Sequence, residues 1–498
     1  MKRWYYPALA LLLGLAIAQV LATAQVYLSN VELYGTLLAV RDAGYFPIPN
    51  EQIMPHLQEL RPAFFGGLFF TLSTGVGLSL VWLVAAWLWD RLFYRIKFFL
   101  ILYFLLWVLS LVLVNYRGLN PLVSLYFLFI PPLVFAATLR WIPTQARQRA
   151  WLDRMINAVP LLLLAILWTS QMDRNLFLDL RDKLLLSNPV GIKINDFYYD
   201  YTLYPAEVFK SLDQKILKTC NLAGIQKKPV AAALEKKLLN YDYLNVGRTH
   251  RIHLEIEELD NNLVFRNGGK TILRTTLRDF LSDPRTVLEE FSAKNDKYVF
   301  FRQFTFFSLL FGFPIALYIF LYTLLRLLTG LFLNSRPSSA IASILCFLAG
   351  IAFLFILNFG ERETMEVKDL GEVLNSVNWQ KRVEALKLIE QKKIEIADFP
   401  GYQSLLSSPR IPERYWLVRA LGVSRRPETY ADVVAFLDDP HPNVVGMAFY
   451  ALGQRGEKRA INGIIKRIET SNHWYNQWHA YKALRKLGWK QSKKPPHS

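Results

Sequence analysis

The stretch FFLILYFLLWVLSLVLVN, residues 98–115, decides the class of this protein. It carries no charged residue, and as a helix it would nearly cross a hydrocarbon core of about 30 Å. Working outward from it, similar apolar stretches lie at about 5–27, 63–89, 121–139, 155–171, 303–325 and 339–359. The chain of 498 residues is therefore predicted to be a mostly α, polytopic membrane protein with about seven spans.

The short loops between these stretches differ in positive charge. Every second loop is rich in Lys and Arg: Lys2, Arg3, Arg91, Arg95, Lys97, Arg140, Arg147, Arg149, Arg154, Arg326 and Arg336. The intervening loops hold only Arg41, Arg61 and Arg117. Because positive loops stay in the cytoplasm, the N-terminus is expected there, and seven spans put the C-terminus outside. We expect a multi-pass protein of the bacterial inner membrane.

The net charge of +18 has a related explanation. Positive loops alone raise the charge of a membrane protein, so we do not expect a nucleic-acid partner. One excess remains near the C-terminus, where residues 455–498 hold eleven Lys or Arg against two Asp or Glu. This basic end could contact anionic lipid or an acidic partner, or could simply be solvated.

The start of the chain allows two interpretations. Lys2 and Arg3, the apolar run and the Ala22-Thr23-Ala24 sequence resemble a signal peptide with its cleavage site. The apolar run from Trp4 is long for a signal peptide, so we favour an uncleaved first helix. Cleavage would remove one span and leave the orientation of the others unchanged.

Inside the spans, small residues indicate packing rather than transport. They recur every four residues on the second span, at Ala63, Gly67, Thr71, Gly75 and Ser79, and such a stripe lets another helix approach closely. Pro131-Pro132 and Pro314 should kink their helices. No ionisable residue lies near the middle of a span, which lowers the expectation of a proton or ion path.

The first soluble region, residues 173–299, is predicted to be a small α+β domain inserted between spans. Helical patterns lie at about 205–220, 229–242 and 277–297. Alternating or β-prone stretches predict strands at 252–256, 263–266 and 271–275, with a hairpin turn at Asn267-Gly268. With the loop charges above, this domain and residues 360–498 fall on the same extracytoplasmic side.

An aromatic and acidic segment opens this region. Asp196 and Asp200 would share one helix face, beside Tyr198, Tyr199 and Tyr201. Three readings remain open: interfacial or domain packing, a surface that binds sugars or cations, and catalysis by paired carboxylates. The first outer loop, 28–62, holds further acids but no D-x-D spacing.

Other sequence patterns that suggest a phosphate, metal or thiol site lack features that such a site requires. Gly269-Lys270-Thr271 lacks the earlier glycine and the strand-to-helix setting of a phosphate-binding loop. His250 and His253 would point to opposite faces of a strand, so no metal site is expected. With two isolated cysteines and no CxxC motif, thiol redox chemistry and zinc have no support, and no cofactor is expected.

The C-terminal region, 360–498, contains an internal repeat. Ala-Leu pairs recur at residues 385, 420, 451 and 483, and similar turns precede three of them: Ser408-Pro409, Asp438-Asp439-Pro440 and Ser471-Asn472. A period of 31 to 35 residues is typical of stacked helix pairs, in which neighbours bury faces that no single pair can bury alone.

The third unit, DVVAFLDDPHPNVVGMAFYALGQRGEKRAINGIIKRI, resembles the short HEAT repeat of the phycobilisome-lyase type. The resemblance covers about residues 370–490, with Gly446 where the family usually has arginine. It implies an α-solenoid that binds proteins or other macromolecules on its concave face, and it does not imply lyase activity. In the last unit, an aromatic cluster including His473, Trp474 and Trp478 is either packing of the terminal repeat or a partner contact.

These features favour an integral membrane scaffold or assembly factor. Its domains would be 1–172 (five membrane helices), 173–299 (α+β), 300–359 (two membrane helices) and 360–498 (HEAT-like repeats). An envelope protein would bind the repeats, and the lipid bilayer would surround the spans. Two alternatives stay open: a membrane enzyme acting on lipid-linked or envelope polymers, and an export or transport component. The enzyme alternative requires a cavity at the outer membrane surface.

Overall fold

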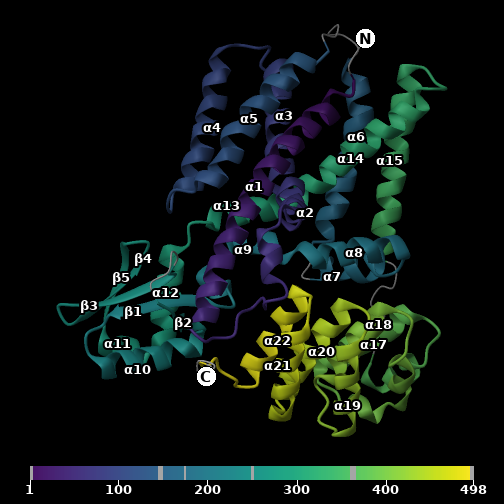
Figure 1. Ribbon diagram of the computed structural model, residues 1–498. Coiled ribbons are helices and arrows are strands. Elements are labelled where there is room, and N and C mark those ends of the chain that lie inside the picture. Colours follow the sequence, from purple (N-terminus) through teal and green to yellow (C-terminus); the bar gives the residue numbers. More distant parts are fainter. Residues whose placement is uncertain (1–3, 144–149, 173–174, 248–251, 359–365, 494–498) are drawn as a thin grey trace.

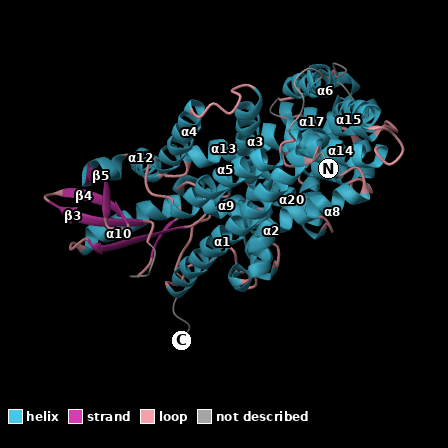
Figure 2. Cartoon of the chain, turned by 90° about the horizontal axis from the view of Figure 1, so that it is seen from above, coloured by secondary structure: helices cyan, strands magenta, loops and turns pink. Residues whose placement is uncertain are grey.

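The computed structural model describes the whole chain apart from residues 1–3, 144–149, 173–174, 248–251, 359–365 and 494–498. His250 therefore lies outside the described residues. The fold is mostly helical, with one five-stranded sheet. Long helices fill one end of the molecule, and the sheet and the C-terminal repeats lie together at the other end (Figure 1). Seen from above, the strands gather at one side (Figure 2).

Within the described residues, six helices are long and apolar enough to cross a membrane, as expected for a multi-pass protein. They are Tyr6–Asp42 (α1), Leu60–Arg91 (α2 and α3), Phe98–Asn115 (α4), Pro121–Trp141 (α5), Val299–Thr329 (α13 and α14) and Ser335–Leu357 (in α15). The expected span at 155–171 falls on α6, Ala150–Ser170, whose described apolar part, Val159–Ser170, is shorter than the others.

Helix α1 is longer than its apolar stretch. Its 37 residues would extend about 55 Å, well beyond a hydrocarbon core of about 30 Å. Residues 28–42, which we expected in an outer loop, continue this helix and pack against α9, Leu203–Phe209. Helix α1 thus runs without a break from the membrane part into the soluble part of the molecule.

The small residues of the second span face α1. The contacts pair Gly67 with Ala22, Thr71 with Gln19, Gly75 with Ala18, and Ser79 with Gly14. A methyl group added at Gly75 would lie 2.5 Å from Cβ of Ala18, and the Thr71 hydroxyl donates to Gln19 at 2.7 Å. Any larger side chain in this stripe would push the two helices apart.

The prolines inside the membrane helices act differently. Pro131 and Pro132 lie within α5, which continues through them as one helix. Pro314 lies in the first turn of α14, Phe313–Thr329, directly after a π-helical turn at Ser308–Gly312. A second π-helical turn, Thr71–Gly75, separates α2 from α3 and packs against the first. These wider turns shape the helix bundle.

The sheet has the strand order β2-β1-β3-β4-β5. Its strands are β1 Lys218–Gly224, β2 Tyr243–Asn245, β3 Leu254–Leu259, β4 Asn262–Asn267 and β5 Lys270–Thr276. Strands β1, β2 and β3 are parallel, whereas β3, β4 and β5 are antiparallel. The three strands expected from the sequence are present, and Gly268 and Gly269, both with positive φ, form the hairpin turn between β4 and β5.

Two of the helix predictions for this domain are partly wrong. The pattern at 205–220 gives the short α9 and a 3₁₀ turn at Leu212–Gln214, and residues from Lys218 form the interior strand β1, whose first five residues are buried. A short strand buried on both faces has no alternation to reveal it. The helix expected at 277–297 is two helices, α11 Leu277–Ser282 and α12 Pro284–Asn295, divided at Pro284. Helix α10, Lys228–Leu238, matches its prediction.

Residues 176–209 form a layer of their own. It consists of α7 Leu176–Asp179, a π-helical stretch Leu180–Leu185, α8 Pro189–Tyr201 and α9. None of them belongs to the core of the sheet, which uses residues from Leu212 to Phe291. The layer lies instead between the membrane helices and the C-terminal repeats (Figure 1).

The C-terminal region folds into stacked helices. These are α16 Leu370–Leu374, α17 Trp379–Lys392, α18 Ile411–Leu421, α19 Glu428–Ala435, α20 Pro442–Arg455, α21 Ile461–Thr470 and α22 Trp474–Lys486. The Ala-Leu-Gly motifs explain their close stacking. A methyl group at Gly422 would lie 2.9 Å from Cα of Ala451, and one at Gly453 would lie 3.1 Å from Cα of Ala483.

Candidate docking interface and junction cleft

Helix α8 carries the candidate acidic and aromatic residues and crosses one face of the C-terminal repeats. The Asn188 side chain caps it by accepting from the amide of Gly191 at 2.8 Å. Gly191 is required at this corner, because a methyl group there would lie 2.2 Å from the carbonyl oxygen of Leu185. The corner aims one side of α8 at the N-terminal ends of α20 and α22.

Four neighbouring contacts join α8 to those two helices. They pair Asn195 with Asn443 (3.0 Å, buried), Asp196 with His441 (3.0 Å), Tyr199 with Tyr475 (ring centroids 4.5 Å) and Asp200 with His473 (3.3 Å). The two carboxylates thus face different histidines rather than one shared atom. Burial lowers the pKa of His441, although Asp196 opposes this effect. The arrangement holds two domains together.

The remaining aromatics of α8 point elsewhere. Tyr198 is 50% exposed, whereas Tyr201 packs against Phe65 of α2 with ring centroids 5.0 Å apart. Helix α8 is therefore a three-sided spacer, with one side on the repeats, one side on a membrane helix and one side in solvent. An aromatic cage around one ligand is not formed by these residues.

A buried ion pair anchors the other end of the layer. Arg181 and Asp182 contact each other at 2.7 Å, and Trp416 of α18 donates its indole N–H to Asp182 at 2.7 Å. The Arg181 guanidinium lies 3.8 Å from the ring centre of Tyr415. Burial lowers the pKa of Arg181, but the Asp182 carboxylate together with Tyr415 and Tyr199 outweighs this effect, and the pKa is raised. No sequence pattern indicates this site, because adjacent Arg and Asp usually lie in solvent.

Residues 401–485 match the family model of HEAT repeats. The C-terminal domain is a HEAT-repeat domain. No curated protein and no solved structure matches the chain. The matched residues cover α18 to α22, so the family accounts for the docked domain and not for the layer on which it docks.

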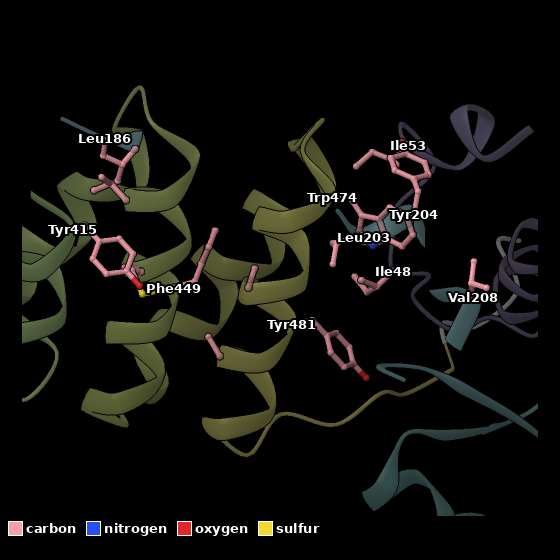
Figure 3. Close-up of a cluster of buried hydrophobic side chains, with 14 of the residues drawn as sticks. Ile48, Ile53, Leu186, Leu203, Tyr204, Val208, Tyr415, Phe449, Trp474 and Tyr481 are labelled. Atoms are coloured by element: carbon pink, nitrogen blue, oxygen red, sulfur yellow. The ribbon is translucent and has the colours of Figure 1, made fainter. Parts of the chain in front are cut away.

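The last HEAT repeat is the most heavily docked. Trp474 is buried beside Tyr204, with ring centroids 5.0 Å apart, and near Ile48 and Ile53 of the loop after α1 (Figure 3). In the same loop, the Asn50 side-chain amide donates to the carbonyls of Ile468, Glu469 and Ser471. Trp474 and His473, chosen from the sequence, therefore contact this chain's own membrane-proximal segments.

The basic C-terminal end is also engaged. Arg485 pairs with Asp242 at 3.1 Å and Lys493 pairs with Glu235 at 2.9 Å, both in the α+β domain. The hydroxyl of Tyr481 donates to Asp242 at 2.6 Å. Part of the positive charge that could have met lipid or a partner is thus neutralised within the chain.

A cleft of about 610 Å³ opens where the domains meet, and we call it the junction cleft. Its walls come from α1, the start of α5, the α+β domain and α22, including Trp474 and Trp478. The lining contains six cationic side chains, Arg117, Lys210, Lys215, Lys270, Lys294 and Lys297, and three carboxylates, Glu32, Glu207 and Asp296. No cluster of residues suited to a metal ion occurs in the described part of the chain.

Glu207 and Asp296 in the cleft each have a cationic partner. Glu207 contacts Lys210, and Asp296 accepts from Arg302 at 3.1 Å. Burial raises the pKa of Glu207, but Lys210 and Lys215 outweigh it and the pKa is lowered. Glu207 therefore stays ionised and stabilises the wall rather than exchanging protons with a substrate.

Proposed function

We propose that this protein is a membrane-anchored scaffold that presents one face of its HEAT domain to a protein partner. The observation that carries the proposal is the way the domain is docked. The row of α17, α18, α20 and α22 lies on the α7–α8 layer, through contacts such as Trp416 to Asp182 and Asn443 to Asn195. Helices α19 and α21 are on the other side, so they form the face offered to a partner.

The α21 part of this open face is positively charged, which favours an acidic partner. Lys458 and Lys466 are exposed, and Arg467 lies beside them. Charged residues at a rim steer partners of opposite sign. The partner is an envelope protein with an acidic patch, and the anchored domain holds it near the membrane surface.

The topology belongs to the same proposal. Arg326 lies 4.4 Å from the ring centre of Trp4, so the N-terminal end shares one side of the bundle with the α14–α15 connection. Both soluble domains lie on the opposite side (Figure 1). Four crossings by α1, α2–α3, α4 and α5 return the chain to the N-terminal side, so α6 supplies a fifth. Together with the positive loops on the N-terminal side, seven spans support our proposal that both soluble domains lie outside the cytoplasm of a bacterial cell.

Site-specific photo-crosslinking tests the scaffold. A photoreactive residue at Asn462 or Lys466, both exposed on α21, should give one discrete protein adduct in native membranes. The same residue at the exposed Lys236 of α10 should not. Reversing the charge of Lys458 should weaken the Asn462 adduct. Adducts that are absent from α21, or equal at Lys236, would contradict the proposal.

Cysteine labelling tests the topology. The native Cys220 and Cys346 are buried, so the background should be low. A membrane-impermeant maleimide added outside intact cells should label Lys227→Cys in the α+β domain and spare Arg336→Cys in the first turn of α15. The reverse pattern would place both soluble domains in the cytoplasm.

The enzyme alternative is weaker, because it requires acids available for catalysis in a cavity at the membrane surface. The junction cleft lies at that level and Glu32 of the expected first outer loop lines it, yet Glu207 and Asp296 are held in ion pairs there. Asp196 and Asp200 do not line it. The cleft is better suited to hold a ligand than to turn one over.

A further inference from the structure

The junction cleft lies where membrane helices begin and end. The apolar stretch of α1 ends near residue 27, and Leu28 and Leu33 line the cleft just beyond it. Helix α5 begins at Pro121 and α13 at Val299, and Pro121 and Tyr298 also line the cleft. Its apolar wall therefore continues into the membrane surface, while the opposite wall belongs to a soluble domain.

The excess of positive charge in the cleft favours an anionic ligand. The lining holds six cationic side chains and three carboxylates, and Glu207 and Asp296 each have a cationic partner. Arg117, Lys270 and Lys294 come from three different segments and are exposed. Lys294 also contacts Glu290 at 2.6 Å, so Arg117 and Lys270 supply most of the positive charge at the rim. Positive charge beside a membrane surface attracts anionic headgroups.

Buried polar atoms in the walls add a second, independent observation. The side-chain oxygens of Gln25 and Asn120 have no hydrogen-bond partner among the described residues, and each residue is only 2% exposed. The indole N–H of Trp478 is likewise buried without a partner in that part of the chain. Buried polar atoms without partners are costly, so a ligand with hydroxyl donors and acceptor oxygens would satisfy them.

From these observations we infer that the junction cleft binds the head of a phosphate-bearing lipid that also carries hydroxyl groups. The phosphate meets the lysine and arginine side chains, and hydroxyls donate to Gln25 and Asn120. The acyl or prenyl chains follow the apolar wall of α1 into the bilayer. Trp474 and Trp478 bring the HEAT domain to the same ligand, so an occupied cleft would strengthen its docking.

Lipid titration followed by native mass spectrometry tests this inference on the full-length protein in detergent. Phosphatidylglycerol should bind at least about tenfold more tightly than zwitterionic phosphatidylcholine, because each basic residue near a lipid surface contributes about 1 kcal/mol. Phosphatidylmethanol has the charge of phosphatidylglycerol without its hydroxyls and should bind more weakly. A polyprenyl phosphate-linked hexose distinguishes the two sources: tighter binding than phosphatidylglycerol assigns a lipid carrier, and weaker binding assigns a membrane lipid.

A charge-reversal variant and its control complete the experiment. The triple variant R117E/K270E/K294E should lose at least about tenfold in affinity. The matched variant K228E/K236E/R278E, with three exposed cations outside the cleft, should bind like the parent. Unchanged melting of both variants shows that the fold is retained. Equal binding of phosphatidylcholine, or full binding by the first variant, would overturn the inference, and equal binding of phosphatidylmethanol would remove the hydroxyl contacts.

Discussion

The two faces of the HEAT domain meet different surroundings. On one face, Trp416 and Asn443 are buried against the α7–α8 layer of the same chain. On the other face, Asn462 and Lys466 of α21 lie exposed. A HEAT family assignment predicts a protein-binding surface but does not say which face stays available. Here the chain itself covers one face and leaves the other open.

The covered face also differs in its chemistry. Its contacts are buried, specific and mixed: one ion pair with an indole donor, an Asn-Asn hydrogen bond and aromatic rings in contact. The open face has exposed ion pairs, such as Arg467 with Asp438. Buried partners are costly to remove and exposed ones are not. Four substitutions therefore test the comparison.

The largest effect is expected from Asp182→Asn. It leaves Arg181 buried beside a neutral amide, and breaking a buried pair in this way costs about 3–5 kcal/mol. Hydrogen exchange in α18 should speed up as its docking weakens. The control is Asp398→Asn, whose pair with Arg426 is 56% exposed on both sides. Equal exchange in the two variants would mean that the layer does not hold the domain.

A pair of glycines gives the next effect. A side chain at Gly446 would meet Tyr475 at 3.0 Å and His479 at 3.2 Å, so Gly446→Leu should cost about 2 kcal/mol by overpacking. Nothing lies within 4 Å of a methyl group at Gly463 on α21. Gly463→Leu should instead stabilise its helix by about 0.5–1 kcal/mol. Thermal unfolding of the two variants should shift in opposite directions.

Acid should weaken the covered face. Burial, helped by Lys482, lowers the pKa of His479 from 6.5 to about 3, so the folded domain keeps this imidazole neutral. Its contribution is complete above pH 6.5 and is lost as the pH falls toward 3. At pH 5 the loss should be about 1–2 kcal/mol.

Denaturation at pH 7.5 and pH 5 measures this loss. His479→Gln should reduce the difference in stability between the two values, whereas His56→Gln, at an exposed histidine paired with Glu59, should keep it. A pH dependence that survives His479→Gln would assign the effect to other groups.

The fold was predictable wherever one local rule decided it. The length of the apolar stretches predicted the membrane helices. Small residues repeated every four positions, including Gly67 and Gly75, predicted a surface where two helices pack closely, and Gly268 predicted the hairpin turn. The interior strand β1 was missed because burial on both faces removes the alternation that marks a strand.

The site was less predictable, for a different reason. Asp196, Asp200, His473 and Trp474 were each chosen as unusual, but no local rule indicates that α8 and α22 meet. The residues come together only because the segment after α6 and the last repeat are folded onto one another across more than 270 residues of sequence. Similarly, the junction cleft takes its walls from four separate regions.

The smallest stability effect, and the sharpest functional one, is expected from Arg467→Ala on the open face. Its pair with Asp438 is exposed, 41% and 66% for the two side chains, so the substitution should change unfolding by less than about 1 kcal/mol. If α21 meets an acidic partner, the same change should nevertheless weaken the photo-adduct at Asn462 severalfold. Arg467 would then contribute to binding of the partner while adding little to the stability of the fold. An adduct that survives Arg467→Ala undiminished would leave the open face without its proposed role.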